Sequence, residues 1–511
     1  MSFVSLEFII FLLVVYLVHY FVPAKFRWCV LLVGSIFFYC FAGWKKLLFV
    51  LASCDTAYIV ALWIDTIYGD LTIDSREQKR KCRRILFAGI SITILLLLYA
   101  KIGQRLIDSF VNVYRGEEDF VSIIVPLGIS YYTFGIIGYM VDVYYKKDKA
   151  ERNFFKLLLY MIYFPQILEG PIPRHKKNAI QFESGNRADY KTFCFGVQRM
   201  LWGYFKKMVI ADRLGVLTSE ILTNYKNYEG AYFWVCIIAS AFQLYCDFSG
   251  CMDIALGASE CFGIKLDENF NHPFFSESAA EFWRRWHITL GTWFKDYVYM
   301  PIVINPKLIF FTGKARKKFG KKVAKNLMTI VPLAVVWLLT GLWHGTGLDY
   351  ICWGIYWGVI IICSTVFAPE LKKLTEILHI DTDAGWWHTF RKLRTFLIFC
   401  GGRALTAPGN IAVSGTILKS MFTTWNPWVL VDDSLYTLGL NLKNFWLVIF
   451  SLFFLLFVSY KQERGIKIRE KIASYPLPLR WAVYYVAFFS IIIFGMYGPG
   501  YNASDFVYMK F

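Results

Sequence analysis

Two histidines lie inside stretches that otherwise have the composition of membrane segments. His287 lies in EFWRRWHITLGTWFKD (281–296), and His344 lies in LWHGTG (342–347). A histidine at membrane depth loses its hydration, so it needs a polar partner, a wet cavity or a chemical task. Imidazole is also the side chain best suited to moving protons near neutral pH. The pair therefore indicates proton-transfer chemistry inside a lipid-embedded protein.

The surroundings of His344 favour a general base. An apolar helix is expected over 327–343, and glycines on both sides of the histidine let backbone or a ligand approach closely. A neutral imidazole in a partly dry site can take a proton from a hydroxyl or a thiol. The alternative is a hydrogen-bonded structural histidine in a membrane loop.

His287 lies in a segment that combines aromatic and basic residues. As one helix, residues 281–296 would place four side chains on one face: Phe282, Trp286, Thr289 and Trp293. Arg284 and Arg285 lie on other faces and could attract an anionic group, such as that of a phosphorylated donor. The alternative is an interfacial helix with aromatics in lipid and arginines on phosphates.

Further polar residues lie in apolar runs. Asp247 and Asp253 fall in one expected span, where a carboxylate is costly unless it is paired. The available partners are Arg199, Lys206, Arg284 and Arg285. These aspartates either lock helices together or bind substrate. Gln166 belongs to YFPQILEGPIPR (163–174), whose prolines should break a helix at membrane depth.

The composition predicts the elements that must position these residues. Of 511 residues, 57% are hydrophobic, and a span needs roughly 20 apolar residues. Ten windows meet this: 3–22, 27–43, 46–64, 85–101, 121–142, 231–246, 327–343, 348–368, 444–460 and 481–497. Less uniform candidates are 153–168, 194–211 and 394–412. We therefore expect an all-α polytopic membrane protein with about 11–13 helices in a single domain over 1–511.

Two segments depart from this pattern. Residues 257–325 are too polar for a simple span yet rich in Phe and Trp, and such a segment is tolerated where it is buried in protein or lines a watery cavity. We expect the site there. Residues 413–443 should form an outer loop with a short helix.

The net charge of +18 comes largely from basic clusters beside apolar runs, among them 76–84, 314–325 and 461–471. The positive-inside rule assigns such loops to the cytoplasm, so the charge does not indicate nucleic-acid binding. Counting spans between these loops places both termini outside. The twelve cysteines show no CxxC pair, and no histidine spacing indicates a metal site.

Several blocks together resemble the membrane-bound O-acyltransferase family, in particular its bacterial alginate O-acetylation and D-alanyl-transfer members. EFWRRWHITLGTWFKDYVYMPI (281–302) resembles the family signature most closely. Other similar blocks are PLGISYYTF (126–134), YFPQILEGPIPR (163–174), YCDFSGCMDIALG (245–257), ENFNHPF (268–274), GLWHG (341–345) and YGPGYNASDFVYMKF (497–511).

The resemblance implies a ring of helices around a central funnel or tunnel, with His344 as the key histidine and His287 as the second. It implies acyl transfer from a cytoplasmic thioester to an extracytoplasmic acceptor, with no bound cofactor. Acetyl-CoA is the expected donor and a cell-surface polysaccharide the expected acceptor. Candidate substrate- or donor-binding residues are Arg284, Arg285, Trp286, Trp343, Asp247, Asp253 and Gln166.

Alternatives stay open at this point. One is D-alanyl transfer to teichoic acid from a cytoplasmic acyl carrier protein. Another, from a different class, is a transporter or flippase without covalent chemistry, although the sequence shows no two-half repeat. The resemblance also implies a separate extracytoplasmic acyltransferase as a partner, together with the acceptor polymer and the lipid bilayer.

Overall fold

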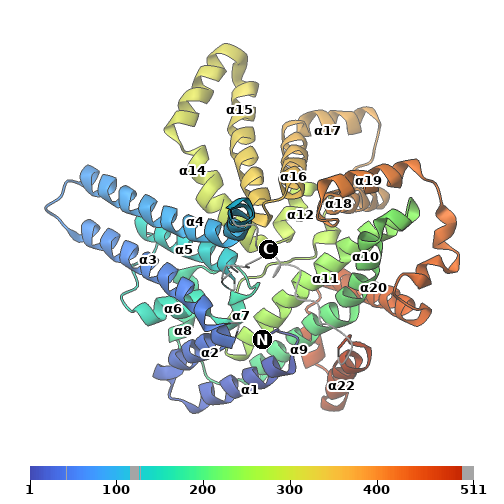
Figure 1. Cartoon of the computed structure of the whole chain (residues 1–511), viewed down its shortest axis with the longest axis horizontal. Coiled ribbons are helices and arrows are strands. Elements are labelled where there is room, and N and C mark those ends of the chain that lie inside the picture. The colour runs from blue at the N-terminus through green and yellow to red at the C-terminus, as the bar shows by residue number, and fades with distance from the viewer. Residues whose placement is uncertain (42, 115–125, 127, 498–511) are drawn as a thin grey trace. The chain divides into compact units, whose positions relative to one another are not determined.

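In the part of the chain that the structure describes, the regular elements are helices (Figure 1). The computed structural model describes residues 1–41, 43–114, 126 and 128–497. Within these residues, the only strand-like pairing is an isolated antiparallel bridge between Phe270 and Trp286. The predicted all-α class is confirmed, since apolar segments satisfy their own backbone hydrogen bonds when they form helices.

Eight described helices are long and apolar enough to cross a membrane. They comprise residues 24–41, α3 (Trp44–Gly69), residues 75–103 of α4 (Ser75–Tyr114), α11 (Ala231–Cys261), α15 (Pro306–His344), α16 (Leu348–Val366), α20 (Leu442–Glu463) and α22 (Leu477–Phe494). Two shorter apolar helices are α1 (Leu6–Phe21) and α19 (Ile411–Thr423). The protein is therefore a multi-pass membrane protein, as predicted.

Other expected spans are shortened or broken. The window 121–142 is represented by α5 (Ile129–Tyr144), while 121–125 and 127 lie outside the described residues. The window 153–168 divides at Tyr163 into α6 (Phe154–Ile162) and α7 (Phe164–Ile167). This break was predicted, because Pro165 cannot donate a backbone hydrogen bond to a continuing helix.

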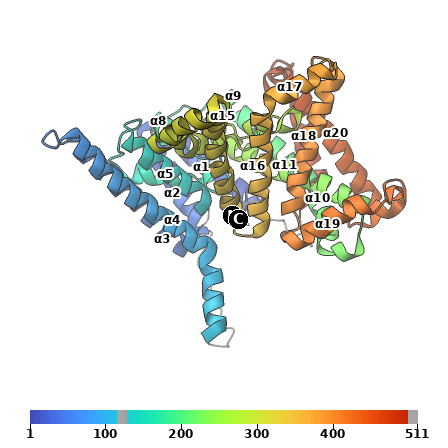
Figure 2. The ribbon, with the colours of Figure 1, turned by 90° about the horizontal axis from the view of Figure 1, so that it is seen from above.

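The chain forms two compact units, residues 1–200 with 251–267 and residues 201–250 with 268–511. The expected single domain over 1–511 stays a prediction. The first unit contains α1 and α3–α7. It also contains η1 (Ala24–Phe26), α2 (Arg27–Phe41), α8 (His175–Glu183), most of α9 (Tyr190–Tyr204) and the end of α11. Helices α3 and α4 of this unit lie side by side (Figure 1, Figure 2).

The second unit contains α15, α16, α19, α20, α22 and most of α11. Its other segments are η2 (Phe205–Ala211, a π-helix), α10 (Asp212–Thr223), η3 (Tyr225–Asn227), η4 (Pro273–Phe275), α12 (Ala279–Arg285), α13 (Ile288–Phe294), η5 (Lys295–Tyr299), α14 (Met300–Val303), α17 (Ala368–Ile377), α18 (Gly385–Thr406), η6 (Pro427–Leu430), η7 (Asp433–Thr437) and α21 (Ile468–Ala473). The expected short helix of the 413–443 segment corresponds to α19.

The basic segment 314–325, which we expected to be a loop, is helical instead. Helix α15 runs from Pro306 to His344 but turns sharply at Gly320, whose φ of 88° is accessible to glycine. The two arms form a hairpin, visible beside α14 in Figure 1. Thr312 of the first arm lies 3.4 Å from the sulfur of Met328 in the second. Lysine and arginine are good helix formers, so a basic cluster need not be a loop.

Candidate active site

The segment that carries His287 is not one helix, contrary to the expectation for 281–296. Helix α12 ends at Arg285, Trp286 is extended, and His287 adopts a left-handed conformation (φ 47°, ψ 53°) before α13 begins. The preceding strand-like segment holds this break. The Asn271 N–H donates to the Arg285 carbonyl at 2.9 Å, and the Ile288 N–H donates to the Asn269 carbonyl at 3.0 Å.

The break changes which side chains share a surface. Phe282, Trp286, Thr289 and Trp293 belong to two helices and the link between them, so they do not form the predicted single helical face. A non-glycine residue with positive φ is strained by about 1–3 kcal/mol, and such strain is frequent at functional sites. His287 is one of four described non-glycine residues with this conformation.

The His287 side chain is buried, with 2% of its surface exposed. Its Nδ1 atom lies 3.2 Å from the Asn269 side-chain oxygen. Phe248 packs edge-on against the imidazole with ring centroids 4.9 Å apart, and Trp343 lies at 6.1 Å. Burial lowers the pKa of His287 to about 3, so the ring is neutral at physiological pH.

His344 is the last residue of α15 and is also buried. The Trp353 ring packs edge-on against it at 4.9 Å, and the Tyr350 ring lies nearly parallel at 6.4 Å. A Cβ at Gly345 would meet the Tyr350 ring at 2.3 Å, so only glycine permits this approach. The group that approaches Gly345 is a side chain, whereas we expected backbone or a ligand there, and that expectation stays a prediction.

Trp343 lies next to both histidines. Its indole is 4.7 Å from the His344 ring and 6.1 Å from the His287 ring. The fold therefore brings together three candidate residues that the sequence places in two motifs. Trp286, by contrast, packs against Phe270 and Phe399, each at 5.0 Å. It is 2% exposed, which makes it part of an aromatic core with these phenylalanines.

Helix α15 and helix α16 approach closely just before His344. A Cβ at Gly354 would lie 2.7 Å from the Trp337 carbonyl and 3.1 Å from the Gly341 Cα. Glycines at such a crossing allow two membrane helices to come into backbone contact. The crossing holds the end of α15, and with it His344, against Tyr350 and Trp353 of α16.

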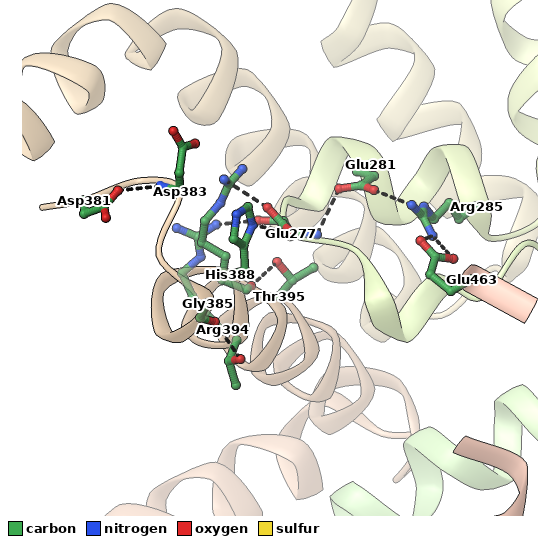
Figure 3. A network of polar contacts seen from close by, with 12 residues as sticks. Glu277, Glu281, Arg285, Asp381, Asp383, Gly385, His388, Arg394, Thr395 and Glu463 are labelled. Carbon is green, nitrogen blue, oxygen red and sulfur yellow. Dashed lines mark hydrogen bonds and ion pairs between the residues drawn. The ribbon is translucent and has the colours of Figure 1, made fainter. Parts of the chain in front are cut away.

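Arg284 and Arg285 occupy different environments. Arg284 is exposed. Arg285 makes ion pairs of 2.8 Å with Glu281 of its own helix and with Glu463 at the end of α20 (Figure 3). Arg285 therefore joins α12 to α20, whereas Arg284 is the cation of this pair that is open to solvent.

A second set of polar contacts fixes the segment that leads into α12. Glu277 lies 2.8 Å from His388 and 3.0 Å from Arg391, and its carbonyl accepts a hydrogen bond from Arg394. The three basic residues belong to α18, as Figure 3 shows for His388 and Arg394. The backbone leading to His287 is thus tied to α18 and α20 through charged groups.

Asp247 is paired, but not with an expected partner. Lys207, rather than Lys206, donates to Asp247 at 2.7 Å and also pairs with Asp212 at 3.0 Å. Lys206 donates to the Ser249 hydroxyl at 2.9 Å. The wide turn of the π-helix η2 explains how two consecutive lysines both make polar contacts with α11. Asp247 thus joins α11 to η2.

Asp253 and Gln166 belong to the first unit. Asp253 accepts a hydrogen bond of 3.0 Å from Arg199, which was one of the expected partners. Gln166 donates to the Pro171 carbonyl at 2.9 Å and accepts from the Asn178 amide at 3.1 Å. These contacts hold the proline-rich segment 163–174 in place.

Sequence reasoning missed several residues that the structure places around the candidate site: Asn269, Lys207 and Glu463. Asn269 was visible only as part of the block ENFNHPF, and Lys207 only as the neighbour of Lys206. No local signal connects Glu463 to Arg285, since 178 residues separate them. Among the described residues, no cluster of three or more His, Cys, Asp or Glu could hold a metal ion.

Comparison with known proteins gives consistent matches. A family model described as MBOAT, membrane-bound O-acyltransferase family, matches residues 142–374, which include every candidate site residue that the sequence predicted. A probable alginate O-acetylase of Pseudomonas putida is 30% identical over 437 residues, covering 84% of this chain and 82% of that protein.

Two further relatives have other named acceptors. A peptidoglycan O-acetyltransferase of Helicobacter pylori is 28% identical over 418 residues, covering 76% of this chain and 73% of its own. A teichoic acid D-alanyltransferase of Bacillus subtilis is 28% identical over 337 residues, covering 64% of this chain and 80% of its own.

Proposed function

Because this chain belongs to the membrane-bound O-acyltransferase family and is an acyltransferase, we propose that it transfers an acetyl group to a cell-surface polysaccharide. The donor in this proposal is a cytoplasmic thioester, with acetyl-CoA as the first candidate. The acceptor is a hydroxyl group on a polymer outside the membrane. The enzyme would use acetyl-CoA as a substrate and hold no resident cofactor.

Two buried histidines that both pack against Trp343 support this function. Acyl transfer to a hydroxyl needs a base that removes the hydroxyl proton, and a buried imidazole can serve. His344 takes that proton while the hydroxyl oxygen attacks the thioester carbonyl. The tetrahedral intermediate then expels the thiolate, which receives the proton from His344. The products are an acetyl ester and a free thiol. His287 binds or orients the donor or the acceptor.

The extent of the matches favours acetyl over D-alanyl transfer. The aligned region covers 84% of this chain for the probable alginate O-acetylase but 64% for the D-alanyltransferase. D-alanyl transfer from a cytoplasmic acyl carrier protein is the second candidate, because that relative is aligned over 80% of its own length. An extracytoplasmic acyltransferase that completes the transfer is a further proposed partner.

A donor comparison tests the proposal. Membranes that contain the protein are supplied with labelled acetyl-CoA or with a D-alanyl carrier-protein thioester, and the label on the extracytoplasmic polymer is measured. We expect transfer from acetyl-CoA with release of one thiol per ester formed. Transfer from the carrier thioester alone would instead establish the second candidate. Movement of unmodified substrate without thiol release would contradict acyl transfer.

A further inference from the structure

Asn269 makes several contacts with the backbone and side chains around His287. Its side-chain oxygen accepts a hydrogen bond from the Thr289 N–H at 3.0 Å and from the Thr289 hydroxyl at 2.9 Å. The same oxygen lies 3.2 Å from His287 Nδ1. Asn269 is 1% exposed, so these contacts form in a dry environment. One buried amide oxygen is therefore shared by His287 and by the first turn of α13.

The orientation of this amide follows from its neighbours. The oxygen and nitrogen of an asparagine are hard to distinguish by shape, so the hydrogen bonds must decide between them. A backbone N–H can only donate, and the Thr289 N–H points at the atom in question. That atom must therefore be the acceptor oxygen.

This orientation decides the tautomer of His287. An amide oxygen can only accept, so Nδ1 of the imidazole must carry the proton that lies between them. The opposite tautomer would place two lone pairs face to face in a buried site. Burial disfavours the doubly protonated ring, which leaves the neutral form with its proton on Nδ1. The basic nitrogen is then Nε2.

We propose that Asn269 is a positioning residue that holds His287 in the Nδ1–H form, so that Nε2 accepts a hydrogen bond from an O–H or N–H group of the substrate. Such a nitrogen cannot stabilise an oxyanion, which needs a donor. This inference rests on the proposed function for the role of His287, but the tautomer itself does not. It narrows the role of His287 to accepting a hydrogen bond from a substrate group, such as the hydroxyl that receives the acetyl group.

The tautomer can be measured without an activity assay. Nitrogen-15 NMR of the full-length protein, labelled at histidine and reconstituted in nanodiscs, distinguishes protonated from unprotonated ring nitrogens. The signals of His287 are identified by their loss in His287→Asn. We expect an unprotonated Nε2 and a protonated Nδ1 from pH 6 to pH 8. A protonated Nε2 would overturn the proposal.

Variants of Asn269 test the effect on catalysis. Asn269→Asp keeps an acceptor for all three donors, the Thr289 N–H, the Thr289 hydroxyl and His287 Nδ1, but adds a negative charge, which raises the pKa of His287. We expect the acid limb of its pH–rate profile to move to higher pH, because protonated Nε2 no longer accepts. Asn269→Leu removes the acceptor and should lower the rate at least tenfold. A profile for Asn269→Asp that superimposes on the wild type would overturn the proposal.

Thr289→Val is the matched control. It removes the hydroxyl donor from the same amide oxygen but leaves the Thr289 backbone N–H and the His287 contact in place. We expect its tautomer and its pH profile to remain those of the wild type. If the wild-type tautomer is as expected but His287→Asn transfers acetyl groups at the full rate, the substrate contact of His287 is overturned, while acyl transfer by the protein stands.

Discussion

The candidate active site places two imidazoles against one indole ring. The Trp343 indole packs against the rings of both His344 and His287, and both histidines are buried. Burial favours the neutral form of the His287 imidazole, and electrostatic interactions with reacting groups are stronger in such surroundings than in water. At the scale of single residues, one histidine can therefore move a proton while the other binds a substrate group.

Replacement of His344 should remove most of the activity. We expect His344→Ala to lower the rate of acetyl transfer by about 10²–10⁴-fold, because the hydroxyl proton has no base. Label incorporated into the polymer is measured at equal amounts of membrane-inserted protein. His379→Asn is the control, since His379 is exposed and asparagine tolerates its positive φ of 51°. Wild-type transfer by His344→Ala would contradict the assigned role.

The buried His287 should make the protein sensitive to acid. Its pKa falls from 6.5 to about 3 on folding because burial disfavours the cation. The neutral ring therefore contributes its full stability above pH 6.5, and this contribution is lost as the pH falls toward about 3, because the unfolded chain binds a proton that the folded chain does not. We expect the unfolding midpoint of His287→Asn in nanodiscs to fall less steeply over this range. An unchanged slope would argue against a buried neutral histidine.

At the scale of elements, glycines and ion pairs position the site. The crossing of α15 and α16 at Gly341 and Gly354 places His344 at the start of a tight connection. Glu277, just before α12, contacts α18, and Arg285, at the end of α12, contacts α20. Since α12 leads directly to His287, this histidine is held by contacts between helices that are distant in sequence, whereas His344 is held by the contact of α15 with the next helix, α16.

Filling the helix crossing should destabilise the protein. Gly354→Ala introduces a methyl group 2.7 Å from the Trp337 carbonyl, and the backbone must move to accommodate it. We expect a loss of about 1–3 kcal/mol in the free energy of unfolding. Gly313→Ala, in the same hairpin as His344, has open space around the new methyl group and serves as the control. Thermal unfolding in detergent compares the two, and equal midpoints would contradict close packing at Gly354.

At the scale of the whole molecule, apolar helices place the chain in a membrane while basic segments predict its orientation. The positive-inside rule assigns the α15 hairpin to the cytoplasm and the segment after α19 to the opposite side. This orientation matches a function in which a cytoplasmic thioester serves an extracytoplasmic polymer. Both termini are then proposed to lie on the extracytoplasmic side. Residues 498–511, at the C-terminal end, are not among the residues that the structure describes.

Cysteine labelling tests this orientation. A membrane-impermeant maleimide should label Lys318→Cys only in inverted vesicles and Asp433→Cys only in right-side-out vesicles. Both positions are exposed, so access rather than burial decides the result. Labelling of the unsubstituted chain, which has twelve cysteines, is measured as the background. Labelling of both positions from the same side would overturn the proposed orientation.

The sequence by itself determined the helical membrane class, because apolar runs of this length have few other ways to satisfy their backbone. It also predicted His287 and His344 as candidate site residues, since ionisable residues in such runs are rare and costly. The break at Tyr163 was predicted for a similar local reason, because proline acts on its own turn of helix. These properties depend on residues that are close together in the chain.

Only the tertiary structure decided the partners of these residues. The left-handed turn at His287 depends on hydrogen bonds from the 269–271 segment, which helical periodicity does not reveal. The choice of Lys207 over Lys206 depends on a π-helical turn, and the Arg285–Glu463 pair depends on how α12 meets α20. Such contacts join residues far apart in the chain, so their geometry depends on packing between helices rather than on any local pattern.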